Sequence, residues 1–201
     1  MTDNRNKYVR VNKAPGFPGP LTRNQNEVVH LVKRAIGGDS EAFGNLYIKY
    51  VEPIYRYIFY QVKDKMIAED ITQEAFIKAW NSIHSCQGKE HTFSSWLYRI
   101  AHNNMIDTFR SKKWELPLDT DTAAKVIDDK SDLETRLEYR QLLDNIASLP
   151  QNQRQVIILK FIQGLDNQEI GQVMLKSQGA IRILQKRALD TLRANFGRSK
   201  R

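Results

Sequence analysis

Apolar residues recur at three- and four-residue intervals along most of the chain, which is the spacing of one face of an α-helix. The first such stretch runs from Val28 to Ile36. Gly37 and Gly38 follow it and should end the helix, and Asp39 is a suitable N-cap for the next one. The pattern therefore predicts a short first helix followed at once by a second.

A longer apolar stripe runs from Phe43 to Val62 and predicts one helix. Pro53 lies inside it and should kink it, because proline removes one backbone hydrogen bond. The same spacing predicts a third helix over about 65–83 and a fourth over about 92–110. The polar segment 84–91 contains a glycine and is predicted to be a loop.

The second half of the chain also has a helical pattern. Segment 113–131 shows no strong apolar period, and helices resume near Asp132. Another helix should start at Leu149-Pro150, since proline is tolerated in a first turn, and end near Gly164. Alternation typical of strands never extends beyond a few residues.

These patterns predict an all-α fold of two small helical domains. The first domain is expected over 25–112 and the second over 134–201, joined by a flexible acidic linker over 113–133. Residues 1–24 are basic, rich in proline and glycine, and without a period, so they are expected to form a disordered extension.

Residues 165–197 carry the clearest motif. Asp166 and Glu169 have the spacing of a capping box and should open a short helix, and Ser177 is placed to cap a second one. The apolar positions of that second helix share one face, and its cations are left outside it: Arg182, Lys186, Arg187 and Arg193. A short helix, a turn and a basic helix fit the major groove of DNA, and a helical hairpin with a solvated basic face is the alternative.

The distribution of charge supports a nucleic-acid partner. The formal net charge is +8 and the pI is about 9.5, a balance that favours nucleic acid or a membrane surface. Residues 150–201 hold ten Lys and Arg against three Asp and Glu, whereas 114–134 hold seven Asp and Glu against two Lys. No apolar run is long enough for a membrane span, and a single cysteine, Cys86, fits the reducing cytoplasm.

The third predicted helix has a face rich in hydrogen-bond acceptors. Asp70, Gln73, Glu74 and Ile77 share it, because they are spaced three and four residues apart. Two interpretations remain open from the residues alone: a solvated polar face, or a surface for a basic partner.

The fourth predicted helix combines aromatic and polar residues. Phe93 and Trp96 precede Arg99, Asn103 and Arg110, which lie along a second face. Aromatic rings can stack unpaired bases while cations hold phosphates. The alternative is that Phe93 and Trp96 are ordinary core residues.

Catalysis and metal binding find little support. His84, Cys86, His91 and His102 could supply metal ligands, but their spacing matches no standard zinc pattern. The chain has no glycine-rich phosphate loop and no recognisable pair of nucleophile and base. We therefore expect no enzyme activity, no cofactor and no metal.

Together, the motifs resemble the bacterial sigma-70 family, specifically its extracytoplasmic-function (ECF) group. Three segments resemble region 2 of that family: GDSEAFGNLYIKYVEPIYRY (38–57), AEDITQEAFIKAW (68–80) and FSSWLYRIAHNNMIDTFR (93–110). Two others resemble region 4: SLPQNQRQVIILKFIQGLDNQEIGQVM (148–174) and GAIRILQKRAL (179–189). The intermediate region of larger sigma factors has no counterpart.

The resemblance implies roles for particular residues. Region 2 of the family binds the clamp helices of the polymerase β′ subunit, and its signature corresponds to Asp70, Gln73 and Glu74. The residues expected to capture the opened −10 strand are Phe93, Trp96, Arg99, Asn103 and Arg110. The residues expected to read the −35 duplex are Ser177, Gln178, Arg182, Lys186 and Arg187. Further partners implied are the polymerase β flap, promoter DNA and an anti-sigma factor.

This chain also departs from the family pattern. Leu175 stands where the turn of the helix-turn-helix is expected to have glycine, which predicts a different turn or some strain. Lys176, Ile183 and Leu184 also differ from common family choices. The alternatives to a sigma factor are a stand-alone helix-turn-helix regulator and, with less support, an RNA-binding adaptor.

Overall fold

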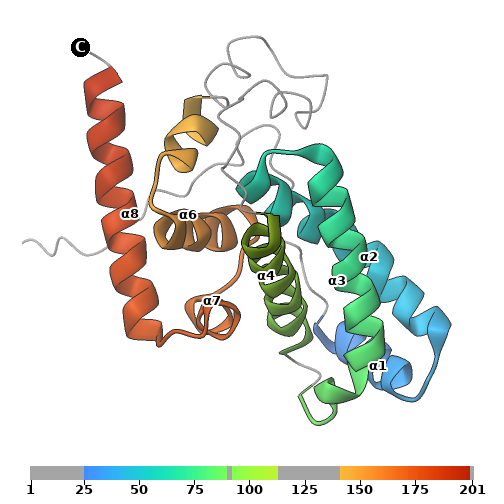
Figure 1. The fold of residues 1–201 in the computed structure, drawn as a ribbon. Coiled ribbons are helices and arrows are strands. Elements are labelled where there is room, and N and C mark those ends of the chain that lie inside the picture. Colours follow the sequence, from blue (N-terminus) through green and yellow to red (C-terminus); the bar gives the residue numbers. More distant parts are fainter. Residues whose placement is uncertain (1–24, 90–91, 113–140, 200–201) are drawn as a thin grey trace, which may run out of the picture.

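The computed structural model describes residues 25–89, 92–112 and 141–199. Within these ranges the chain forms helices and turns and no strand (Figure 1). The predicted all-α class is therefore confirmed. The expected extension over 1–24 and the expected acidic linker over 113–133 lie outside the described residues.

Four α-helices build the N-terminal half, and their apolar stripes face one another. They are α1 (Gln25–Ile36), α2 (Ser40–Val62), α3 (Lys65–Ser82) and α4 (Phe93–Lys112). A short 3-10 helix, η1 (Ile83–Cys86), follows α3. The sequence predicts a polar loop from residue 84 onward. The chain stays helical to Cys86 because Ile83 and Cys86, three residues apart, are both buried.

Local signals set the ends of these helices as the sequence predicts. Gly38 follows α1 with a φ of 91°, a conformation that glycine adopts at little cost. The carboxylate of Asp39 caps α2 by accepting a 3.0 Å hydrogen bond from the backbone N–H of Ala42. That bond, together with the neighbouring Arg34, lowers the pKa of Asp39. α2 then continues as one α-helix past Pro53 to Val62.

The C-terminal half contains a helical segment over 141–147 and four named elements. These are α6 (Gln151–Ile157), the π-helix η4 (Ile158–Ile162), α7 (Asn167–Met174) and α8 (Gln178–Ser199). The helix predicted from Leu149-Pro150 is present, but its last turn is widened. The N–H of Gln163 donates to the carbonyl of Ile158, five residues back, at 3.0 Å. This wider turn precedes Leu165, which is only 1% exposed.

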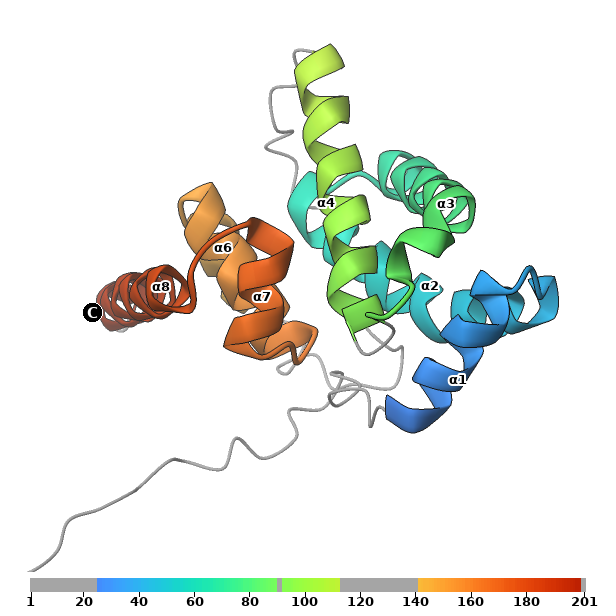
Figure 2. The same ribbon diagram turned by 90° about the horizontal axis from the view of Figure 1, so that it is seen from below.

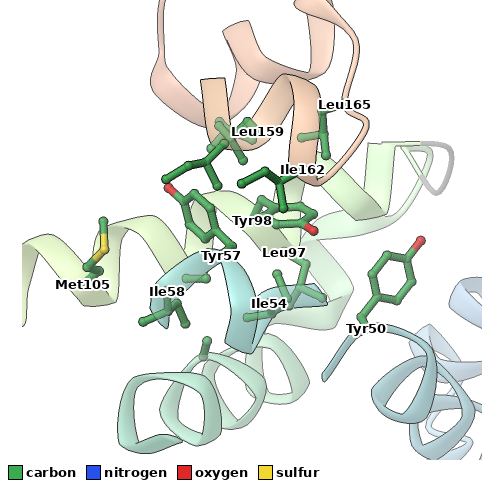
Figure 3. Close-up of a cluster of buried hydrophobic side chains, with 14 of the residues drawn as sticks. Tyr50, Ile54, Tyr57, Ile58, Leu97, Tyr98, Met105, Leu159, Ile162 and Leu165 are labelled. Atoms are coloured by element: carbon green, nitrogen blue, oxygen red, sulfur yellow. The ribbon is translucent and has the colours of Figure 1, made fainter. Parts of the chain in front are cut away.

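The two halves pack directly against each other. In both ribbon views α4 lies between α3 and α7 (Figures 1 and 2). Figure 3 shows the rings of Tyr57 and Tyr98, from α2 and α4, beside Leu159, Ile162 and Leu165 of the C-terminal half. All five side chains are buried, and they belong to one continuous apolar core. The expected pair of domains therefore shares a core.

Buried polar side chains also bridge the halves. The side-chain amide of Gln155 donates to the hydroxyl of Tyr57 and lies against Nδ1 of His102, both at 2.9 Å. The hydroxyl oxygen of Tyr57 lies 3.2 Å from the same Nδ1 atom of His102. Burial lowers the pKa of His102 and raises that of Tyr57, so both rings are held neutral at neutral pH.

Three further hydrogen bonds involve buried side chains, and two of them join the halves. Nε of Arg154 donates to the side-chain oxygen of Gln61 at 3.1 Å, and its Nη1 donates to the carbonyl of Ala147 at 3.1 Å. The hydroxyl of Tyr98 donates to the side-chain oxygen of Gln163 at 2.9 Å. Buried polar groups cost free energy unless they are paired, so these bonds help to fix one arrangement of the halves.

Candidate protein and nucleic-acid interfaces

α3 presents the predicted acceptor-rich face to solvent. Asp70, Gln73 and Glu74 are all exposed, and Ile77 beside them is 61% exposed. The opposite side of the helix packs into the core through Ala68, Ile71, Ala75 and Ala79. The exposed isoleucine follows the acceptors one turn further along α3, so the face combines polar groups with apolar surface, as protein interfaces do.

The position of Glu74 on this face is fixed by neighbouring residues. Its carboxylate forms a 2.8 Å ion pair with Lys78, one turn further along α3. The ammonium group of Lys78 also donates to the side-chain oxygen of Asn104 in α4, at 2.6 Å. α4 thereby holds the cation that orients Glu74.

The structure corrects the proposed role of Phe93. This ring is completely buried, with its centroid 5.4 Å from that of Tyr50 and 5.6 Å from that of Trp96. A base cannot reach it, so Phe93 is a core residue, and its ring packs against that of Trp96. Trp96 itself is partly exposed and remains available for stacking.

The polar candidates of α4 share one exposed face with Trp96. Arg99, Asn103 and Arg110 follow it at spacings of three, four and seven residues, and all three are exposed. Two cations and an amide thus extend over more than three turns of helix, which suits a strand whose phosphates follow the helix axis.

A cavity of about 370 Å³ opens beside Trp96 at the start of α4. Its walls come from η1, the following loop, α4 and α7, through Ser85, Cys86, Lys89, Thr92, Ser95, Trp96, Arg99 and Gln172. Its volume is in the range of small-molecule pockets, about 300–1,000 Å³. Two cations, hydroxyls and an indole ring suit an anionic, aromatic ligand such as a nucleotide.

Sequence reasoning missed Ser95, Lys89 and Gln172 as parts of this cavity. Ser95 and Lys89 adjoin the motif, and the spacing of Ser95 from Arg99, one helical turn, could have indicated it. Gln172 lies 77 residues further along the chain, so no local pattern connects it. The hydroxyl of Ser95 lies 2.5 Å from the side-chain oxygen of Gln172 and 2.9 Å from the carbonyl of Thr92.

The helix-turn-helix has the geometry that the sequence predicts at both helix starts. The carboxylate of Asp166 accepts 2.8 Å bonds from the N–H groups of Gln168 and Glu169, and Glu169 accepts from the N–H of Asp166 at 2.8 Å. This is a complete capping box. The hydroxyl of Ser177 accepts from the N–H of Ala180 at 3.2 Å and caps α8.

The turn between these helices contains the strain expected at Leu175. Its φ of 53° and ψ of 45° place it in the left-handed region, and its side chain is 74% exposed. Glycine is instead required earlier, at Gly171, where a Cβ atom would lie 2.7 Å from the carbonyl oxygen of Lys176. The turn thus closes tightly onto α7.

α8 exposes one basic face. Ile181, Ala188 and Leu192 are buried against the rest of the C-terminal half. The residues predicted for duplex reading are all exposed, at or beyond the start of the helix: Ser177, Gln178, Arg182, Lys186 and Arg187.

The histidine and cysteine candidates do not form a cluster in the described part of the chain. No group of three His, Cys, Asp or Glu side chains there could hold a metal ion. Cys86 is buried, His84 is exposed and His102 is bound to Tyr57 and Gln155. His91 lies outside the described residues. Within the same ranges, no helix is long and apolar enough to span a bilayer.

Two family models match the chain in the order of its two halves. Sigma-70 region 2 matches residues 46–115, and sigma-70 region 4 matches residues 146–194. The first model covers the α3 and α4 faces, and the second covers the helix-turn-helix.

Curated relatives agree with this division. The chain is 39% identical over 173 residues to the ECF RNA polymerase sigma factor BldN of Streptomyces coelicolor, a match covering 82% of this chain and 64% of that protein. It is 35% identical over 164 residues to SigX of Bacillus subtilis, covering 78% and 84% of the two chains. For SigW of the same species the identity is 33% over 174 residues, covering 81% and 92%.

Solved structures show the same fold. CnrH, in complex with the cytosolic domain of CnrY, matches with a TM-score of 0.65 at 22% identity, over 85% of this chain and 97% of that one. RpoE of Bartonella quintana, in complex with the anti-sigma factor NepR, matches with a TM-score of 0.61 at 18% identity, over 76% and 94%. With both regions present in order and with relatives of this similarity, the chain belongs to the sigma-70 family of RNA polymerase sigma factors, in its ECF group.

Proposed function

We propose that this chain directs promoter-specific initiation through three separate surfaces. The face of α3 binds the β′ clamp helices of core RNA polymerase, α4 with its cavity captures the opened −10 strand, and α8 reads the −35 duplex. The observation that supports this most directly is that the polar faces of α3, α4 and α8 are all exposed, on a chain that carries regions 2 and 4.

The α3 face supplies acceptors for cations on the polymerase. Asp70 and Glu74 are exposed one turn apart, and Lys78 orients the second of them. Removing a hydrogen bond to a charged group costs about 1.5–3 kcal/mol, or roughly 10- to 150-fold in affinity. We expect Asp70→Ala with Glu74→Ala to weaken core binding by at least tenfold in a fluorescence-anisotropy titration.

A matched control removes the same two charges elsewhere. Glu41→Ala with Glu52→Ala deletes two exposed carboxylates of α2 and should leave core affinity within about twofold, because isolated surface charges contribute little. Equal affinity of the α3 double variant and the wild type would contradict the assignment of this face.

The α4 surface combines stacking with charge. Trp96 is partly exposed, and it lines the cavity together with Arg99 and Lys89. A pocket of this kind can offset the few kcal/mol needed to take a base out of its stack. Stacking on an aromatic ring contributes about 1–3 kcal/mol per base, so Trp96→Ala should slow open-complex formation at least fivefold.

A template that is already unpaired around −10 tests the same assignment. Such a template supplies the melted strand without cost, so the Trp96→Ala holoenzyme should form a stable complex on it with a smaller defect than on duplex DNA. An equal defect on duplex and premelted templates would assign Trp96 to binding of the single strand and not to its melting, and an undiminished rate on both would contradict the assignment of Trp96 to this surface.

The α8 surface carries Arg182 in its second turn, where it can reach a base edge or a phosphate. If it reads a base edge, Arg182→Ala should cost about 1–3 kcal/mol and relax specificity at one −35 position. An equal loss on all sequences would assign it to phosphate contact.

One experiment separates this function from that of a stand-alone regulator. Transcription in vitro with core polymerase should start at specific promoters only when the protein is added. A regulator would instead bind duplex operators unaided and give no initiation with core polymerase alone. We further propose that the chain acts in the cytoplasm and catalyses no reaction by itself, as sigma factors are not enzymes.

We also propose an anti-sigma factor as a regulatory partner. One structural relative was solved with an anti-sigma factor bound. A partner that covers the exposed face of α3 would compete with polymerase for Asp70, Gln73 and Glu74. Co-purification followed by competition against core polymerase tests this, and simultaneous binding of both partners would contradict competition at that face.

A further inference from the structure

The basic face of α8 has a large apolar side chain at its centre. Ile183 follows the buried Ile181 by two residues, which places it about 200° around the helix axis, given 3.6 residues per turn. Its side chain is 55% exposed and has the exposed Lys186 and Arg187 one turn further along. Burial within the chain therefore does not account for an isoleucine at this position.

The surface next to Ile183 is open on its N-terminal side. Side chains on a helix lean over the preceding turn, so Ile183 extends towards Gly179, four residues earlier. A Cβ atom at Gly179 would meet only Ser177 Oγ, at an ordinary contact distance of 3.9 Å. The fold could therefore accept a side chain there.

Glycine at this position has an energetic cost that the chain itself does not offset. In a helix glycine is less favourable than alanine, because it loses more backbone entropy when the helix forms. A residue that costs stability and that no internal contact requires indicates close approach by something outside the chain. Gly179 leaves the helix surface on the N-terminal side of Ile183 without a side chain, so a ligand that lies against the first turns of α8 can approach the exposed Ile183 there.

We propose that Ile183, reached through the gap at Gly179, contacts the 5-methyl group of a thymine in the −35 element. This inference rests on the proposed reading of the −35 duplex by α8. The thymine methyl is the apolar group that base edges present in the major groove, and aliphatic side chains read it by contact. Three cations surround Ile183, namely Arg182, Lys186 and Arg187, and they attract the phosphates on either side of the major groove.

The test removes that methyl group and nothing else. The holoenzyme first selects a promoter from a pool randomised over the −35 region, and each thymine of the selected element is then replaced by deoxyuridine. Burial of one methyl contributes about 0.8 kcal/mol, which corresponds to about fourfold in affinity. We expect one thymine at which the replacement weakens holoenzyme binding by about fourfold.

Variants of Ile183 assign that thymine to this side chain. Ile183→Ala should bind the thymine and deoxyuridine promoters equally, and Ile183→Val should retain part of the difference. Ile48→Ala makes the same change at a 74% exposed isoleucine of α2 and should keep the full difference. A fourfold difference that persists in Ile183→Ala would overturn the proposal.

Gly179→Ala tests the gap independently. The structure leaves room for this methyl, so the melting temperature of the variant should be equal to or above that of the wild type. The methyl stands between the helix and the groove, so the preference for thymine over deoxyuridine should fall. A variant that keeps the full preference would show that the DNA does not approach the helix there.

The outcomes distinguish this inference from the function on which it rests. Promoter-specific transcription that depends on Arg182 but shows no deoxyuridine-sensitive thymine would overturn the role of Ile183 alone. Failure of the wild-type protein to direct core polymerase to any promoter would overturn both.

Discussion

Leu175 has an unfavourable backbone conformation at the turn between α7 and α8. Left-handed geometry costs a residue with a Cβ atom about 1–2 kcal/mol, and the 74% exposed side chain recovers little of this by burial. The N–H groups of Leu175 and Lys176 both donate to the carbonyl of Gly171, which holds the turn closed. The sequence predicted either strain or a different turn here, and the structure shows strain.

Leu175→Gly should stabilise the protein. Glycine adopts the observed φ of 53° without the steric penalty, although it loses more entropy on folding. The expected net gain in unfolding free energy is about 1 kcal/mol, measured by urea denaturation at constant m-value. An unchanged midpoint would mean that the exposed leucine side chain contributes as much as the strain costs.

Gly171→Ala should have the opposite effect. Its Cβ atom would lie 2.7 Å from the carbonyl oxygen of Lys176, so the backbone of the turn would have to move. Overpacking of this kind costs about 1–3 kcal/mol. Urea denaturation measures this loss, and a variant as stable as the wild type would show that the turn can relax without cost.

At the scale of single elements, short-range signals predicted most helix limits. α3 was expected over about 65–83 and runs over Lys65–Ser82, and the capping box and the Ser177 cap are both present. The widened turn of η4 was not predictable, because its residues carry the same apolar pattern as an α-helix. Leu159, within this turn, and Leu165, after it, are both buried in the shared core, a tertiary contact that the local pattern does not show.

Asp166→Ala tests how much the capping box contributes to α7. Asp166 and Glu169 satisfy three backbone N–H groups between them, and loss of an N-cap costs about 0.5–2 kcal/mol. The expected result is a lower urea midpoint. Asp190→Ala, which removes only an exposed 3.3 Å ion pair with Arg193, should change the midpoint little. Equal effects of the two changes would contradict a special role for the cap.

At the scale of the whole molecule, the packing of the two halves was beyond sequence reasoning. Periodicity shows that a helix face is buried but not which partner covers it, and Gln155 and Gln163 are polar residues that pattern alone assigns to the surface. The candidate surfaces could be predicted from the sequence because each lies within one helix or at its N-cap. The cavity wall at Gln172 was missed because it depends on the contact between α7 and α4.

The contact between the halves should depend on pH through His102. Burial lowers its folded pKa below the ordinary value of 6.5, so the unfolded chain binds more protons around that pH. The stabilising contribution of the neutral ring is therefore complete above pH 6.5 and is lost as pH falls through the folded pKa. Protonation also turns Nδ1 into a donor that faces the donating amide of Gln155, 2.9 Å away.

Melting temperatures from about pH 7.5 to about pH 5 would measure this dependence. Acidification should lower the melting temperature of the wild type more than that of His102→Gln, which keeps a polar side chain but cannot titrate in this range. Tyr57 and Gln155, the other partners of the ring, stay uncharged throughout, so the difference between the two curves belongs to His102. Parallel curves would mean that the ring escapes to solvent when protonated, and that Tyr57 and Gln155 hold the halves together without it.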